Sequence, residues 1–255
     1  MLVLLANENP ILLSFIGGVI LAAFNAVGAL PVLFFKKVSQ KFLDIGLGFA
    51  AGVMLTASFT SLIIPSIKMG SIFPVIVGIS IGATIVMLAD RIIPHMHFII
   101  GYENPISAKL KAIWLFAIAV TLHNMPEGLV VGIGLGSKEI KAAMSLMLAI
   151  GIQNVPEGLS VGFSLLTTKE YSRLKSYLVS VGSGLIEVPL SLLGAWTVVT
   201  FEALLPYAMG FAAGAMLFVI SDEIIPETHR IGHEKLASFG LMVGLILMLF
   251  LDTVL

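Results

Sequence analysis

HNMPEG occupies residues 123 to 128, and a second copy of the pattern, QNVPEG, occupies residues 153 to 158. Each copy places a nitrogen or amide ligand, a second amide and a carboxylate at helical spacing inside an apolar stretch. A glutamate at the centre of a membrane helix costs roughly 2 to 3 kcal/mol, so two glutamates in this setting need a compensating partner. These residue types suggest that the partner is a divalent metal ion in transit.

Composition places these stretches in a membrane. Hydrophobic residues make up 58% of the chain and charged residues 11%, and the mean hydropathy is +1.07. These values lie outside the range of soluble domains and predict an integral membrane protein with almost no soluble part. The chain contains no cysteine, which excludes disulfides and thiolate metal sites.

Apolar runs of about 20 residues predict eight transmembrane helices. They cover approximately residues 10–35, 42–66, 72–93, 112–136, 140–166, 177–201, 204–226 and 236–255, with a loop over 94–110. Eight crossings put both termini on the same side of the membrane. The first run lacks a basic leader and is too long for a signal peptide, so we expect it to be a retained helix.

Basic residues predict the orientation. The loops after odd-numbered spans carry Lys36, Lys37, Lys41, Arg91, Lys109, Lys111, Lys169, Arg173, Lys175, Arg230 and Lys235. The opposite side carries only Lys68, Lys138 and Lys141. By the positive-inside rule the basic loops face the cytoplasm, so both termini are expected on the non-cytoplasmic side of a cell or bacterial inner membrane.

Internal repeats predict the architecture. The fourth and fifth spans share NxPEGLxVG, and GFAAGVML at 48–55 in the second span recurs as GFAAGAML at 210–217 in the seventh. The members of each pair cross the membrane in opposite directions. Inverted repeats of this kind predict a 3+2+3 arrangement, with spans one to three related to spans six to eight around the central pair and a site at the midplane.

Helical spacing gathers the polar groups of the central pair. One side of the fourth span carries His123, Asn124 and Glu127, and one side of the fifth carries Gln153, Asn154 and Glu157. Pro126 and Pro156 each leave a carbonyl without its helical donor and are expected to kink the helices.

Three further residues are expected to shape the site, two by allowing close packing and one as a further acid. Gly128 and Gly158 allow neighbouring helices to approach closely. Glu187, in the sixth span, is a third acid expected to face the same cavity.

The ligand types limit the ion. Imidazole, amide and carboxylate without thiolate suit Zn²⁺, Fe²⁺, Mn²⁺ or Cd²⁺ rather than Cu⁺. Three carboxylates with His123 exceed what one ion needs, which suggests two adjacent metal positions that share a bridging glutamate. Two other interpretations stay open: the amides could serve only as hydrogen-bonding contacts between helices, and an acid could relay protons.

Histidines in two cytoplasmic loops form a possible exit path. His95 and His97 lie in one loop, and His229 and His233 lie in another. They could receive the ion as it leaves, although loop histidines are as often merely solvated.

HNMPEG followed by QNVPEG, with SGLIEVP in the next span, resembles the metal-binding motifs of the ZIP (Zrt/Irt-like) transporters. GFAAGVML at 48–55, DRIIPHMH at 90–97 and SDEIIPETH at 221–229 resemble its GufA-type branch, and the resemblance covers essentially the whole chain. It implies eight helices, import of zinc and related divalent metals toward the cytosol, and frequently a homodimer. It also implies a central metal site formed by His123, Asn124, Glu127, Gln153, Asn154, Glu157 and Glu187.

Two departures from the family pattern limit how far the roles of family residues can be transferred to this chain. Many family members carry a histidine before the glutamate of the seventh span, where this chain has Asp222 beside Glu223. A secondary metal site there would have carboxylate ligands, which are harder than histidine. The long histidine-rich loop of well-known members is represented here by His95 and His97 alone.

Other classes of function fit less well. An intramembrane metallohydrolase could use the same His and Glu residues, but the chain has no HExxH motif and its repeats are those of a transporter. A metal sensor would need a cytoplasmic domain, and an ATP-driven pump would need a phosphate-binding loop. A passive or secondary transporter of metal ions, with no nucleic-acid partner, is the remaining prediction. Its driving force could be the metal gradient, the membrane potential or protons.

Overall fold

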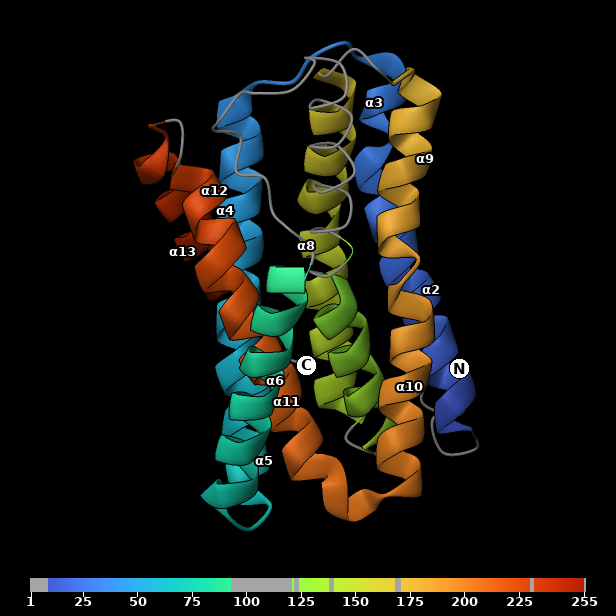
Figure 1. Cartoon of the computed structure of the whole chain (residues 1–255), viewed down its shortest axis with the longest axis vertical. Coiled ribbons are helices and arrows are strands. Elements are labelled where there is room, and N and C mark those ends of the chain that lie inside the picture. The colour runs from blue at the N-terminus through green and yellow to red at the C-terminus, as the bar shows by residue number, and fades with distance from the viewer. Residues whose placement is uncertain are drawn as a thin grey trace.

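A computed structural model describes residues 9–92, 121, 124–137, 140–167, 171–229 and 232–254 (Figure 1). These residues form helices and contain no strand. Six segments are long and apolar enough to cross a membrane: Pro10–Phe34, Gln40–Lys68, Ile72–Ala89, Arg173–Thr200, Glu202–His229 and Glu234–Val254. The prediction of an all-helical membrane protein is therefore confirmed.

The two central spans lie outside these six. Residues 124–136 are helical, but residues 112–120 of the fourth expected span lie outside the described residues. Helix α8 (Ile140–Thr167) covers the fifth expected span, where its polar residues interrupt the apolar run. The number eight thus stays a prediction.

Local signals explain where the first described helix begins. Helix α2 (Pro10–Ala29) has Pro10 in its first turn, and the side chain of Asn9 accepts a hydrogen bond from the Leu12 amide at 3.0 Å. Asparagine at the cap and proline at the first position both favour a helix start. A short helix, α3 (Pro31–Phe34), extends this span.

The sequence repeat corresponds to a structural repeat. Helix α4 (Gln40–Ala57) runs into a wider π-helical turn (Ser58–Ile63) and then α5 (Ile64–Lys68). Helix α11 (Leu205–Val219) likewise runs into a π-helical turn (Ile220–Ile224) and then α12 (Ile225–His229). Pro65 and Pro226, which cannot donate to the preceding turn, lie just beyond the two irregular turns. Because α4 and α11 run in opposite directions (Figure 1), the repeat is inverted as predicted.

The sixth expected span is broken. Two residues separate helix α9 (Arg173–Gly184) from α10 (Glu187–Thr200), and Glu187 is the first residue of α10. Pro189 has no amide hydrogen for the carbonyl of Leu185, which accounts for a break at this place. By contrast, α8 continues as one helix through Pro156.

The helices pack as two bundles. We call the first the metal-motif bundle; it contains α2, α3, residues 124–136, α8, α9 and α10. The second bundle contains α4, α5, α6 (Ile72–Ile92), α11, α12 and α13 (Glu234–Val254). In the second bundle α4 packs on α13 and α11 packs on α6, a pairing that the inverted repeat relates.

Glycines permit these helix pairs to touch along their backbones. A Cβ atom on Gly48 or Gly52 of α4 would overlap a carbonyl oxygen of α13, and one on Gly240 or Gly244 of α13 would overlap a carbonyl oxygen of α4. Equivalent glycines join α6 and α11. Small residues at helix contacts are typical of membrane bundles, where close van der Waals packing stabilises association.

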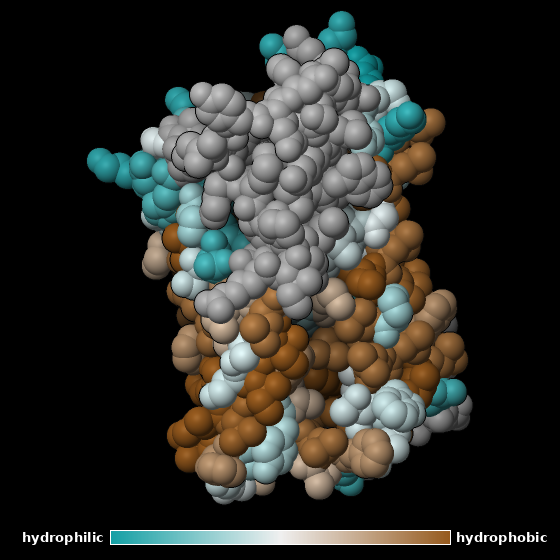
Figure 2. Space-filling view, in the orientation of Figure 1, coloured by the Kyte–Doolittle hydropathy of each residue, from teal (hydrophilic) through white to brown (hydrophobic). Residues whose placement is uncertain are grey.

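The surface reflects the membrane setting. Hydrophobic residues cover most of the lower part of the face in Figure 2, and the most hydrophilic residues gather at the upper end. Large apolar side chains such as Phe73, Ile246 and Phe250 are more than half exposed in the isolated chain. In a bilayer these side chains contact lipid.

Replacing Gly52 with alanine should lower thermal stability. The added Cβ would overlap the Leu241 carbonyl oxygen, and overpacking of this kind costs about 1 to 3 kcal/mol. Thermal unfolding of the purified protein in detergent measures the effect. Gly182→Ala is the matched control, because a Cβ there meets nothing within 4 Å; an equal loss in both variants would contradict the packing argument.

Candidate metal site

The polar residues of both motifs are buried at the centre of the metal-motif bundle. Relative exposure is zero for Asn124, Glu127, Gln153, Asn154 and Glu187 and 3% for Glu157. Three segments carry them: residues 124–136, α8 and the first turn of α10. Complete burial of this many polar groups is expensive unless they hydrogen-bond or bind an ion.

Amide groups of α8 hold two of the carboxyl groups. Gln153 Nε2 donates to Glu127 Oε1, and Asn154 Nδ2 donates to Glu187 Oε1 at 2.6 Å. Neighbouring residues of one helix thus reach acids on two other segments. Asn154 Nδ2 also lies 3.4 Å from the Leu21 carbonyl oxygen of α2.

The three glutamates are close enough to influence one another. Glu187 interacts electrostatically with both Glu127 and Glu157. Bringing three acids together in an apolar interior raises the free energy of their ionised forms. A bound cation would reverse that penalty.

Backbone contacts bring these acids together. A Cβ atom on Gly128 would lie 2.6 Å from the Cα atom and 2.6 Å from the carbonyl oxygen of Glu187. Glycine after Glu127 is therefore required for the approach of α10. Gly158 makes the corresponding contact with the Asn25 backbone of α2, so both motif glycines have the role that the sequence suggested.

Three buried amide oxygens of the two motifs accept no hydrogen bond from any described residue. They belong to Asn124, Gln153 and Asn154. Asn124 uses its nitrogen instead, donating to the Ser183 carbonyl oxygen at 3.1 Å. Amide oxygens suit divalent cations, and an uncommitted buried oxygen is available to such an ion.

Carboxylates and histidines alone do not make a complete site in the described part of the chain. No three His, Cys, Asp or Glu side chains among those residues are grouped closely enough to hold one ion. A coordination sphere built from these helices would therefore include amide oxygens. His123 of the first motif lies outside the described residues, as do His95 and His97.

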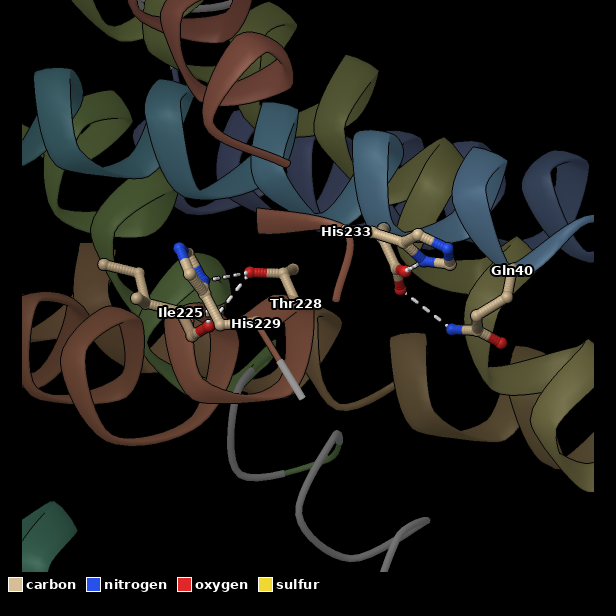
Figure 3. A network of polar contacts seen from close by, with 6 residues as sticks. Gln40, Ile225, Thr228, His229 and His233 are labelled. Atoms are coloured by element: carbon tan, nitrogen blue, oxygen red, sulfur yellow. Dashed lines mark hydrogen bonds and ion pairs between the residues drawn. The ribbon is translucent and has the colours of Figure 1, made fainter. Parts of the chain in front are cut away.

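The remaining sequence-predicted residues lie elsewhere. Asp222 is exposed and Glu223 is half-buried, both in the π-helical turn after α11. His229 is exposed, and its Nδ1 lies 2.7 Å from the Ile225 carbonyl oxygen and 3.1 Å from Thr228 Oγ1 (Figure 3). His229 thus contacts residues of its own helix.

His233 belongs to a separate polar cluster. Its Nδ1 lies 2.6 Å from Asp44 Oδ2, and Gln40 Nε2 donates to Asp44 Oδ1 at 2.8 Å (Figure 3). Asp44 is buried near the start of α4, whereas His233 precedes α13. This contact ties the ends of two helices together, and His229 points into a different set of contacts.

Three buried or half-buried polar residues were missed by sequence reasoning. Asp44 is the partner of His233. Asp252 of α13 accepts hydrogen bonds from Thr60 and from Ser145 of α8. Asn25 of α2 is fully buried against Gly158 and Gly184. Asn25 and Asp252 each interrupt an apolar run, a signal that could have marked them.

The fold and site together describe a multi-pass membrane protein with a buried polar site that could bind a cation. A family model described as ZIP Zinc transporter matches residues 99–252. Zinc transporter ZIPB of Bordetella bronchiseptica is 40% identical over 98% of this chain and 84% of its own length. Human zinc transporter ZIP11 is 31% identical over 98% of this chain and 99% of its own length. Zinc transporter GufA of Myxococcus xanthus is 34% identical over 89% and 93%, respectively.

The chain therefore belongs to the ZIP family, as its motifs indicated. It is a transporter rather than an enzyme.

Replacing Asn154 with alanine should weaken zinc binding about tenfold to a hundredfold. The change removes the hydrogen bond that orients Glu187, and a hydrogen bond to a charged group is worth about 1.5 to 3 kcal/mol. Isothermal titration of the purified protein with zinc measures the affinity. Ser191→Ala, which removes a hydrogen bond to the Ser14 carbonyl oxygen in the same bundle, is the control; comparable weakening there would show general loosening instead.

Proposed function

We propose that this protein moves zinc and related divalent ions, including iron, manganese and cadmium, across a membrane toward the cytoplasm. The ion would bind between residues 124–136, α8 and α10, at the midplane of the metal-motif bundle. The relatives named above are zinc transporters by name, which favours zinc as the principal substrate.

One observation carries this proposal: three glutamates from three segments are buried together, and Glu187 interacts electrostatically with the other two. Glu127, Glu157 and Glu187 come together in an interior with almost no access to solvent. A hydrophobic core gains nothing from such an arrangement, because burial and mutual repulsion both oppose ionisation. A divalent cation converts the same arrangement into a favourable one.

The ligand chemistry agrees with a transition-metal substrate. Carboxylate and amide oxygens come from Glu127, Asn124, Gln153, Asn154, Glu157 and Glu187, and His123 would add an imidazole nitrogen. Nitrogen ligands favour Zn²⁺ over Mg²⁺ or Ca²⁺. Rotation of the Gln153 and Asn154 amides would present their oxygens in place of the nitrogens that now bond the acids.

Two adjacent ions could share the site. The number of ligand groups exceeds the four that Zn²⁺ usually takes, and a glutamate of one motif could bridge two positions. Several weak positions favour release of the ion better than one tight position.

The two-bundle architecture supports alternating access. Inside each bundle, glycines let the backbones touch: Gly132 meets Ser191 in the metal-motif bundle, and Gly52 meets Leu241 in the second. Between the bundles, the close glycine contact among described residues is that of Gly46 with the Pro156 ring, a side-chain contact. Each bundle would therefore move as a unit, and the metal-motif bundle would carry the ion past the second.

Residues at the end of the molecule that carries most of the basic residues, here called the basic end, would receive the ion. His233 and Asp44 contact each other there and could act as ligands. Further candidate groups are His229, His95, His97, Asp222 and Glu223. The positive-inside rule makes this end cytoplasmic. The homodimer and the placement of both termini outside stay predictions.

Glu127→Ala and Glu157→Ala should each abolish saturable zinc uptake while leaving the protein folded, because each removes a ligand and a buried charge. Uptake of radioactive zinc into proteoliposomes holding the purified variants provides the measurement. Glu202→Ala, the same change at an exposed position, is the control and should transport normally. Wild-type uptake by either motif variant would contradict the proposed metal site.

His123→Ala should reduce zinc uptake more than manganese uptake. Imidazole stabilises Zn²⁺ more than Mn²⁺, so its loss changes the ratio between the two metals. Competition between the two metals in the same proteoliposomes reports that ratio. An equal loss for both would remove His123 as the selectivity element.

A further inference from the structure

Two chain segments lie side by side at the basic end of the metal-motif bundle. The end of α3 packs against the beginning of α9, as the upper part of Figure 1 shows. Arg173 Nη1 donates to the Leu33 carbonyl oxygen at 3.2 Å, which fixes the two segments to each other. Residues that follow α3 and residues of the first turn of α9 therefore belong to one surface.

That surface is basic. Lys36 and Lys37 follow α3, and Lys175 lies in the first turn of α9; all three are exposed. None of these lysines takes part in the ion pair seen among the described residues, which joins His233 to Asp44. No acidic residue occurs in the described stretches 31–39 and 171–186. These lysines therefore have no acidic neighbour within the two described stretches; Glu170, which precedes the second stretch, lies outside the described residues.

Large apolar side chains stand beside the lysines. Phe34 is 71% exposed, Phe35 is 61% exposed and Leu174 is 59% exposed. Water-exposed phenylalanines next to lysines would be unfavourable, whereas at the boundary of a bilayer the rings enter the acyl region and the lysines reach the headgroups. We call Lys36, Lys37, Lys175, Phe34, Phe35 and Leu174 the α3/α9 patch.

We propose that the α3/α9 patch binds an anionic phospholipid of the adjacent leaflet, with the headgroup phosphate among the three lysines and the acyl chains against Phe34, Phe35 and Leu174. Charge complementarity selects an anionic over a zwitterionic headgroup. The apolar residues select a lipid over a soluble phosphate. The inference concerns a binding surface outside the metal site and does not depend on which ion is carried.

In the described part of the second bundle, the lysines at this end have acidic residues near them in the chain. Its basic residues at this end include Lys41 and Lys235, which are exposed, but acids lie close to them in the chain: Asp44 follows Lys41 by three residues and Glu234 precedes Lys235. A lipid held at the α3/α9 patch would therefore contact the bundle that carries the metal motifs. If that bundle moves as proposed above, the bound lipid moves with it or is released.

Native mass spectrometry of the full chain in detergent, with equal amounts of dioleoyl-phosphatidylglycerol and dioleoyl-phosphatidylcholine, tests the proposal. The wild type should retain phosphatidylglycerol preferentially. Lys36→Gln/Lys37→Gln/Lys175→Gln should lower that preference about tenfold or more, because each surface charge contributes roughly fivefold. Arginine at the same three positions should preserve it. Arg173 is left in place because its hydrogen bond joins the two segments.

Two comparisons make the test decisive. Lys41→Gln/Lys235→Gln removes lysines from the same end and should keep most of the preference, whereas Phe34→Ser/Phe35→Ser should reduce retention of phosphatidylglycerol. The proposal is overturned if the triple glutamine variant binds as the wild type does, or if the Lys41/Lys235 variant loses as much. Full competition by inorganic phosphate would also overturn it, since that would indicate a soluble anion site. All of these readouts are independent of zinc uptake.

Discussion

The rest of this structure depends on the burial of three interacting carboxyl groups in an apolar bundle. Glu127, Glu157 and Glu187 come from three separate segments, so their association requires that those segments approach closely at one depth. Gly128 permits the approach of α10, and the break before Glu187 places that residue at the start of a helix. The amides of Gln153 and Asn154 then hold two of the acids. Each local feature serves the same polar centre.

Glycine contacts indicate which helices are fixed to each other and which could move relative to each other. Where a glycine lets two backbones touch, as between α4 and α13, sliding would drive a carbonyl oxygen into a neighbouring helix. Between the bundles the packing relies on side chains such as the Pro156 ring facing Gly46. Side chains can change rotamer, whereas backbones in contact cannot. The boundary between the bundles is therefore the surface along which the proposed alternating access would require movement.

Polar residues away from the motifs tie together segments that are distant in the chain. Asp44 joins the start of α4 to the residue before α13 through His233, and Asp252 joins α13 to the turn after α4 and to α8. The contact of Asp252 with Ser145 joins the two bundles, near the end of α13 that is farther from His233. A carboxylate there that accepts hydrogen bonds from both bundles would stabilise the present arrangement against relative movement.

The sequence by itself determined the class of protein, the inverted repeat, the paired motifs and the family, because these follow from hydropathy and from residues close together in the chain. It also anticipated that Gly128 and Gly158 lie at helix contacts. Only the tertiary structure decided that Glu187 interacts with both motif glutamates, that the sixth span breaks beside it, and that Asn154 bonds to Glu187. It alone showed Asp44 beside His233 and α3 beside α9. These relations join residues that are far apart in the chain, and helical periodicity specifies which residues share a face but not which face of another helix that face will meet.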